Sequence, residues 1–271
     1  MSESFTRAIS GLVYVVLLIA MTLFSKISFL ILFAFFLIML IVEFCDLIKL
    51  NKFLALSIGL VLYFLFAFFD IPKKTNSFLI IATLYVSTKL IYLLFSKSVL
   101  KIDAFTKCIY LIGYIVLPII ILTKIPTDIL EQKFQPQIIV SIFTLIWIND
   151  TFAYIVGKSI GKNKLFESIS PKKTIEGFLG GVFFAVIFSV IIAKYFLEKP
   201  VYIWFIIAIL VGVFGTLGDL VESKFKRTAN VKDSGTIMPG HGGILDRLDS
   251  VIFVAPFIFL FLQIIQYFIH D

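Results

Sequence analysis

Long runs of apolar residues, separated by short polar breaks, make up most of the sequence. An apolar run of about 17 to 25 residues is long enough to cross the hydrocarbon core of a bilayer as a helix. Counted between the polar breaks, about nine such runs are present, which predicts an all-α, polytopic integral membrane protein. The predicted spans are residues 8–24, 27–47, 53–69, 77–95, 105–122, 136–156, 174–196, 201–222 and 247–269.

Lys and Arg are distributed unevenly between the loops on the two sides of this predicted bundle. If the N-terminus is cytoplasmic, most of them fall in the loops that follow the even-numbered spans. Cytoplasmic loops of membrane proteins carry an excess of Lys and Arg. We therefore expect residues 157–173 and 223–246 to be cytoplasmic loops, and the C-terminus to lie on the opposite side of the membrane.

Composition agrees with this prediction and excludes some classes of partner. Hydrophobic residues make up 60% of the 271 residues, and the net charge is +7. In a membrane protein a basic excess reflects cytoplasmic loops and anionic headgroups, so we expect no nucleic-acid partner. Cys45 and Cys108 lie in apolar segments and have no metal-binding spacing, so we interpret them as packing residues.

The two halves of the chain differ in chemistry. Residues 1–135, with about five spans, are expected to form a membrane scaffold or an oligomer contact. Their few charges within spans, such as Glu43, are expected to reach the surface from positions close to a span end. Residues 136–271, with about four spans, carry polar residues near the predicted cytoplasmic ends and are expected to hold the active site. The polar residues near these span ends are Asn149, Asp150, Asp219, Glu222, Asp246 and Asp249.

Residues 149–177 combine polar, basic and glycine residues. Asn149 and Asp150 end the sixth predicted span, and Gly-Lys pairs at 157–158 and 161–162 follow. This pattern is compatible with a loop that meets phosphate oxygens, and equally with a solvated basic loop. Ser170-Pro171-Lys172-Lys173-Thr174 predicts a helix start capped by Thr174 or Ser170. Helix N-terminal amides beside two lysines favour phosphate binding, although capping and charge sorting explain the same residues.

Three aspartates indicate a cation site. Asp219, Glu222 and Ser223 share one helix face, and Asp246 and Asp249 share a face at the start of the last span. Paired carboxylates at a helix start also stabilise the helix dipole. Asp219, Asp246 and Asp249 together would suit a hard cation such as Mg²⁺ bound with substrate phosphates.

The stretch from Ser223 to Asp249 concentrates the remaining polar chemistry. His241, between glycines, lacks a second His or Cys at zinc-ligand spacing. It is therefore expected to contact a phosphate, to transfer a proton, or to satisfy the loop backbone. Carboxylates, basic residues and Gly-rich turns at one membrane face favour phosphoryl or nucleotidyl transfer. The residues alone select neither the nucleotide nor the lipid.

The same stretch resembles the signature of the phosphatidate cytidylyltransferases, the CDP-diacylglycerol synthases. The residues in register are Ser223, Phe225, Lys226, Arg227, Lys232, Asp233, Gly235, Pro239, His241, Gly242, Gly243, Asp246, Arg247, Leu248 and Asp249. The resemblance covers about the C-terminal half. It implies condensation of CTP with phosphatidic acid, a Mg²⁺ requirement with K⁺ as a second ion, a homodimer, and a polar cavity open to the cytoplasm and to lipid.

The residue patterns and the family resemblance together predict the roles of individual residues. The predicted catalytic residues are Lys226, Arg227, Lys232, Asp233, His241, Asp246, Arg247 and Asp249. The predicted substrate-binding residues are Asn149, Asp150, Lys158, Lys172, Lys173, Ser223, Gly242 and Gly243. The predicted metal ligands are Asp219, Asp246 and Asp249. Two rival functions are a CTP-dependent polyprenol or dolichol kinase and an ion-coupled transporter, the latter because carboxylates within membranes often line ion pathways.

Overall fold

A computed structural model of the chain describes residues 3–69, 73–96, 103–127 and 133–270. Its helices and strands are α1 Glu3–Phe24, α2 Lys26–Ile48, α3 Lys52–Phe68, α4 Lys73–Phe95, α5 Ala104–Tyr110, η1 Leu111–Val116, α6 Leu117–Lys124, α7 Pro136–Ile160, β1 Lys164–Phe166, β2 Ser170–Thr174, α8 Ile175–Ile191, η2 Ile192–Leu197, α9 Val201–Thr228 and α10 Leu245–His270. Here η1 and η2 are π-helical turns within longer helices. Each predicted apolar span is helical.

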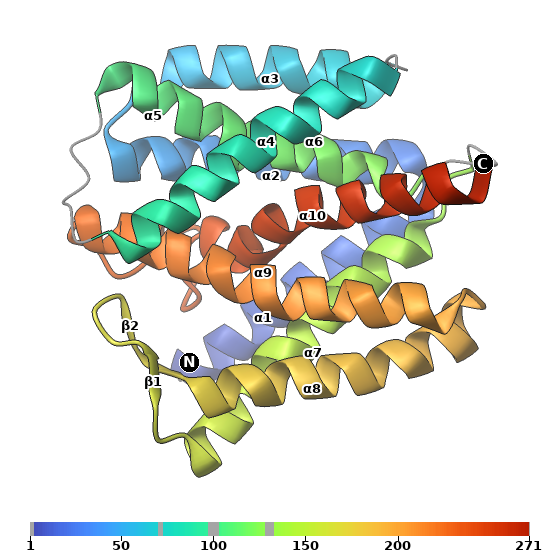
Figure 1. Cartoon of the computed structure of the whole chain (residues 1–271). Helices are drawn as coiled ribbons and strands as arrows, with labels where there is room; N and C mark the ends of the chain where they lie inside the picture. Colours follow the sequence, from blue (N-terminus) through green and yellow to red (C-terminus); the bar gives the residue numbers. More distant parts are fainter. Residues whose placement is uncertain (1–2, 70–72, 97–102, 128–132, 271) are drawn as a thin grey trace.

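Within the described residues, eight helices are long and apolar enough to cross a membrane, and α3 is a shorter apolar helix of 17 residues. Consecutive helices run back and forth, so their ends gather at two ends of the bundle (Figure 1). The N-terminus, the β1–β2 hairpin and the loop between α9 and α10 lie at one end, and the C-terminus lies at the other. The two polar loops thus share one end, as predicted, and the protein is an integral membrane protein.

The boundaries of both polar loops differ from the prediction. Helix α7 continues to Ile160, and α9 continues to Thr228, so residues 157–160 and 223–228 are helical. The extension of α9 is stabilised by an ion pair between Lys226 and Glu222, one turn apart. The loop proper between α9 and α10 is residues 229–244.

The predicted loop 157–173 also contains most of a small antiparallel hairpin, which is the one sheet among the described residues. Thr174 caps α8 by accepting a hydrogen bond from the Gly177 amide. Of the two predicted capping residues, Thr174 and Ser170, it is therefore Thr174 that caps the helix. The Glu176 carboxylate accepts hydrogen bonds from the backbone amides of Lys162 and Asn163 and closes the base of the hairpin.

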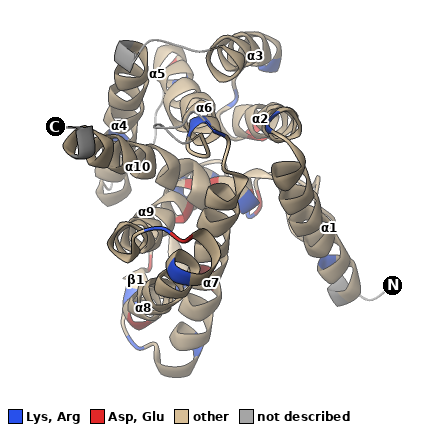
Figure 2. Cartoon of the chain, turned by 90° about the vertical axis from the view of Figure 1, so that its right-hand side faces the viewer, with Lys and Arg blue, Asp and Glu red and all other residues tan. Residues whose placement is uncertain are grey.

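The buried side chains form one cluster that draws on both halves of the chain. Helix α2 lies inside this cluster, and its Phe44 ring packs 5.1 Å from Phe225 of α9. Tyr114 of η1 stacks on Phe225 at 5.8 Å and also lies 5.6 Å from the Phe44 ring. The predicted scaffold is therefore in direct contact with the helices that carry the aspartates. Figure 2, viewed along the helices, shows charged residues as small parts of a mostly uncharged bundle.

Helices α7 and α8 approach each other closely through glycine. A Cβ on Gly181 would lie 2.7 Å from the backbone oxygen of Asn149 and 2.9 Å from its side-chain oxygen. Close contact of this kind through small residues is common between membrane helices. It also fixes Asn149, which is buried beside Asp150.

Gly181→Ala is therefore expected to destabilise the protein by about 1–3 kcal/mol, because the added methyl group overpacks the contact. The measurement is thermal unfolding in detergent. Gly215→Ala is the matched control, since a Cβ there would lie 3.6 Å from its nearest neighbours, at ordinary contact distance. A Gly181→Ala protein as stable as the control would contradict this account of the helix contact.

Candidate functional site

A polar cavity of about 150 Å³ lies between α1, α7, the 229–244 loop and the start of α10. Its lining residues are Gly11, Tyr14, Ile146, Trp147, Asp150, His241, Asp246, Arg247, Asp249 and Ser250. A polar cavity among these helices was predicted. The structure places five predicted site residues on its wall, together with Gly11 and Tyr14 of the first helix, which the sequence interpretation had not included.

Three carboxylates gather beside this cavity. One oxygen each of Asp219, Glu222 and Asp249 lies within 4.8 Å of the other two. Glu222 is 1% exposed and Asp249 is 9% exposed, so their charges lie largely out of contact with water. Asp219 and Asp249 were predicted metal ligands. Glu222, which shares a helix face with Asp219, is the third member of this cluster, and the predicted ligand Asp246 lies outside it.

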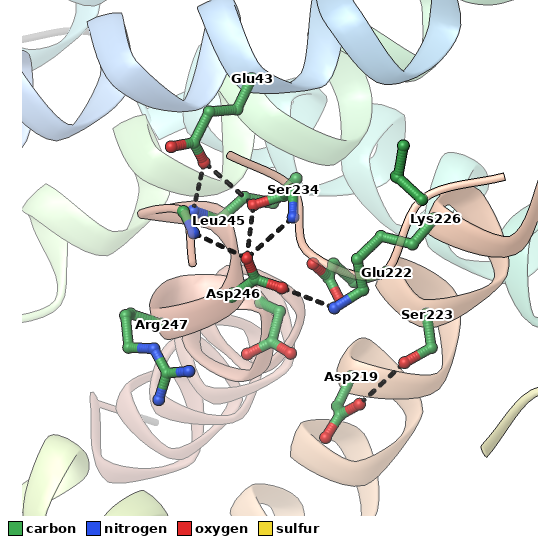
Figure 3. A network of polar contacts seen from close by, with 12 residues as sticks. Glu43, Asp219, Glu222, Ser223, Lys226, Ser234, Leu245, Asp246 and Arg247 are labelled. Carbon is green, nitrogen blue, oxygen red and sulfur yellow. Dashed lines mark hydrogen bonds and ion pairs between the residues drawn. The ribbon is translucent and has the colours of Figure 1, made fainter. Parts of the chain in front are cut away.

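Lys226 lies between the cluster and Asp246 (Figure 3). Its Nζ is 2.5 Å from Glu222 Oε2 and 2.5 Å from Asp246 Oδ1, and its side chain is 11% exposed. Because a buried charge without a partner is strongly unfavourable, this one cation stabilises two carboxylates at once.

Asp246 is held by the loop that precedes it. Its Oδ2 accepts hydrogen bonds from the amides of Ser234 and Gly243, at 2.9 and 2.8 Å, and from the Ser234 hydroxyl at 2.8 Å. Gly242 has a φ of +84°, which glycine adopts without strain. A Cβ there would also lie 2.7 Å from Asp246 Oδ2. Gly242 and Gly243, predicted to bind substrate, are thus placed around Asp246.

Lys173 of β2 contacts a member of the cluster. Its Nζ lies 2.6 Å from Asp219 Oδ2. Burial would lower the pKa of Lys173, but the carboxylates of Asp219, Asp150 and Asp249 outweigh it and hold this pKa above its ordinary value. Asp150 is exposed where it lines the cavity, and it accepts a hydrogen bond from Asn149 Nδ2 at 3.3 Å. Lys173, Asn149 and Asp150 are therefore part of one site with the cluster.

His241 and Arg247 line another part of the cavity wall. His241 Nδ1 lies 2.7 Å from the hydroxyl oxygen of Ser10 on α1, and Arg247 donates a hydrogen bond to the His241 backbone oxygen at 3.0 Å. Burial lowers the pKa of His241, and the positive charges of Arg247 and Arg7 lower it further. His241 is therefore neutral at pH 7, which suits hydrogen bonding rather than ion pairing.

The other predicted residues lie further from the cluster or serve it indirectly. Ser223 is buried and donates a hydrogen bond to Asp219 Oδ1 at 3.3 Å. Arg227 is exposed and donates to the backbone oxygen of Val231. The remaining side chains are exposed and have no ion pair with the cluster among the described residues; they are Lys158, Lys172, Lys232 and Asp233.

Glu43 of α2 was missed. The expectation that it reaches the surface is wrong, because it is 3% exposed. It accepts hydrogen bonds from the amides of Ile244 and Leu245, at 2.9 and 2.8 Å, and from the Ser234 hydroxyl at 3.1 Å. A carboxylate inside a predicted span was the available signal, since such groups are retained for function or pairing.

Comparison with known proteins identifies the family of the chain. The model of the cytidylyltransferase family matches residues 5–265 of the chain. A phosphatidate cytidylyltransferase of Staphylococcus aureus (strain COL) is 52% identical over 116 residues, which are 42% of this chain and 44% of the relative. A Bacillus subtilis (strain 168) protein of the same name is 52% identical over 122 residues, 44% of this chain and 45% of that protein. The alignments therefore span less than half the length of these relatives.

Proposed function

The chain belongs to the cytidylyltransferase family, and we propose that it transfers the CMP group of CTP to phosphatidic acid in phospholipid biosynthesis. A phosphate oxygen of phosphatidic acid attacks the α-phosphorus of CTP and forms a new P–O bond. The bond between the α-phosphorus and the bridging oxygen breaks, and pyrophosphate leaves. The product is CDP-diacylglycerol.

The observation that carries this proposal is the carboxylate cluster Asp219–Glu222–Asp249 beside Lys226 and Lys173. Three clustered carboxylates suit a hard divalent cation, which prefers oxygen ligands and substrate phosphates. Glu222 Oε1 has no hydrogen-bond partner among the described residues, so a buried oxygen is available as a ligand. These residues fit Mg²⁺, which we propose as the cofactor, with K⁺ as a second ion.

Mg²⁺ bound there would neutralise phosphate charge and make the α-phosphorus more electrophilic. The chain's own residues supply position and further charge. Lys173 pairs with Asp219 of the cluster and Arg247 lines the cavity, and both can bind phosphate oxygens there. The phosphatidate monoester is already anionic at neutral pH, so it needs positioning rather than a general base. Neutral His241 donates or accepts a hydrogen bond at the cavity wall.

Two further features belong to the proposal. The end of the bundle that holds the β1–β2 hairpin and the 229–244 loop faces the cytoplasm, because Lys and Arg are concentrated in the loops at that end. The protein acts as a multi-pass protein of the cell's inner or plasma membrane, as a homodimer. Exposed apolar side chains on the outward faces of the helices, such as Phe53 and Phe183, are available for lipid or subunit contact.

The test is an assay of the purified protein in detergent with labelled CTP, phosphatidic acid and Mg²⁺. We expect labelled CDP-diacylglycerol and an equal amount of pyrophosphate, and no product when EDTA replaces Mg²⁺. ATP in place of CTP should give no product. Phosphorylation of a polyprenol with CTP would instead identify a lipid kinase. Ion flux in proteoliposomes without any lipid product would favour a transporter. Either result would overturn the proposal.

A further inference from the structure

We propose that Glu43 is a positioning residue for the active site. It fixes the 229–244 loop and the first turn of α10, and through Asp246 it holds Lys226 beside the carboxylate cluster. The kinetic part of this inference rests on the proposed function. The effect on the loop itself does not depend on it.

The first step is the contact between α2 and the start of α10. The first amides of a helix have no partner within the helix and need an acceptor from elsewhere. Glu43 Oε1 accepts from the Ile244 amide and Oε2 accepts from the Leu245 amide, at 2.9 and 2.8 Å. A carboxylate at this position also interacts favourably with the helix dipole. Glu43 therefore caps α10 from a helix about 200 residues earlier in the chain.

The second step links Glu43 to the polar network. The Ser234 hydroxyl lies between two carboxylates, 3.1 Å from Glu43 Oε2 and 2.8 Å from Asp246 Oδ2. Asp246 Oδ1 contacts Lys226, which contacts Glu222 of the cluster. Figure 3 shows this series of contacts running from α2 to the cluster. A shift of Glu43 would therefore move the side chain that pairs with Lys226.

The third step is the space that the loop leaves for this carboxylate. A Cβ on Gly235 would lie 2.6 Å from Glu43 Oε1. A Cβ on Gly243 would collide with both Glu43 and the Ser234 hydroxyl. Two glycines of the loop thus lie against Glu43, and each hydrogen bond of the Glu43 side chain among the described residues goes to the loop or to α10. Glu43 is fitted to the loop rather than to its own helix.

Glu43→Gln tests the proposal. The two backbone amides require two acceptor oxygens, and a glutamine of the same shape offers one oxygen and one NH₂ group. We expect kcat for CDP-diacylglycerol formation to fall about 100-fold, as a small misplacement of reacting groups can do. Hydrogen exchange at residues 234–248 should become faster. The control is Asp46→Asn on the same helix, which removes an exposed carboxylate paired with Lys52 and should change neither measurement.

A double-mutant cycle with Ser234→Ala separates positioning from general destabilisation. If Glu43 acts through Ser234, the double variant should lose little more activity than Glu43→Gln alone, because coupled residues are not additive. Additive losses, or Glu43→Gln activity within about twofold of wild type, would overturn the proposal. If Glu43→Gln does not fold, Gly235→Ala replaces it, because the added Cβ displaces the same carboxylate. The proposal then predicts the same fall in kcat and the same faster hydrogen exchange at residues 234–248.

The outcomes distinguish this inference from the proposed function. A wild-type protein that makes no CDP-diacylglycerol contradicts the function. Faster exchange at residues 234–248 in Glu43→Gln would then still support the positioning of the loop. An active wild type with unchanged exchange in Glu43→Gln contradicts the positioning role alone.

Discussion

Asp249→Asn is expected to abolish CDP-diacylglycerol formation, with a loss of at least about 1,000-fold, while the protein stays folded. Asp249 contributes one of the three clustered carboxylates and lines the cavity, so the substitution removes charge where the cation and the phosphates meet. The measurement is the initial rate at saturating CTP over a range of Mg²⁺ concentrations. Activity restored at high Mg²⁺ would contradict a direct role in binding the cation.

A second measurement on the same variant does not depend on activity. Three carboxylates with oxygens within 4.8 Å repel one another when no cation is bound. In EDTA, Asp249→Asn should therefore unfold at a higher temperature than wild type. Mg²⁺ should stabilise wild type, by about 2.7 kcal/mol at 100 times its dissociation constant, and stabilise the variant less. Glu198→Gln, which changes an exposed carboxyl in the turn between η2 and α9, should behave as wild type in both conditions.

Lys226→Met is expected to destabilise the protein by about 3–5 kcal/mol, the typical effect of breaking a buried ion pair. Lys226 is the cation between Glu222 and Asp246, and its removal takes the ion-pair partner away from two largely buried carboxylates. Activity should fall with stability, since Glu222 belongs to the cluster. The measurement is thermal unfolding in detergent. Lys194→Met, at an exposed lysine of η2, is the control and is expected to change stability by under about 0.5 kcal/mol.

The double variant Lys226→Met/Glu222→Gln makes this prediction specific. Neutralising Glu222 removes one of the uncompensated charges, so the double variant should be more stable than Lys226→Met alone. A double variant that is equally stable or less stable would show that Lys226 acts through packing of its aliphatic stem instead.

The apolar pattern was sufficient to predict the transmembrane helices, because a span must satisfy its backbone internally and must be apolar over a defined length. It was insufficient for the helix ends. The polar residues 223–228 predict a loop, but the ion pair between Glu222 and Lys226 stabilises a further helical turn there. The β1–β2 hairpin was missed because Ser170–Thr174 lacks the alternation of apolar and polar residues that marks a strand.

The candidate site was predicted in part for a similar reason. Asp219 and Asp249 could be grouped because each lies at the polar end of a span, next to the same loop. Asp246 lies outside the cluster because its carboxylate is held by Ser234 and Gly243 of the loop, and spacing along the chain does not determine that contact. Glu43 is separated from its partners by about 200 residues, so no local pattern could connect them.

The contact between Glu43 and the start of α10 also bears on how the protein is made. Helix α2 leaves the ribosome early, whereas Ile244 and Leu245 lie at the junction of the 229–244 loop with α10. A buried carboxylate near the beginning of the chain must therefore wait, without these amide partners, until nearly all the other helices are in the membrane. Closing so long a loop is slow compared with forming local helical contacts. We expect ribosome-bound chains that lack α10 to be inserted but inactive, and to be the form most open to membrane proteases.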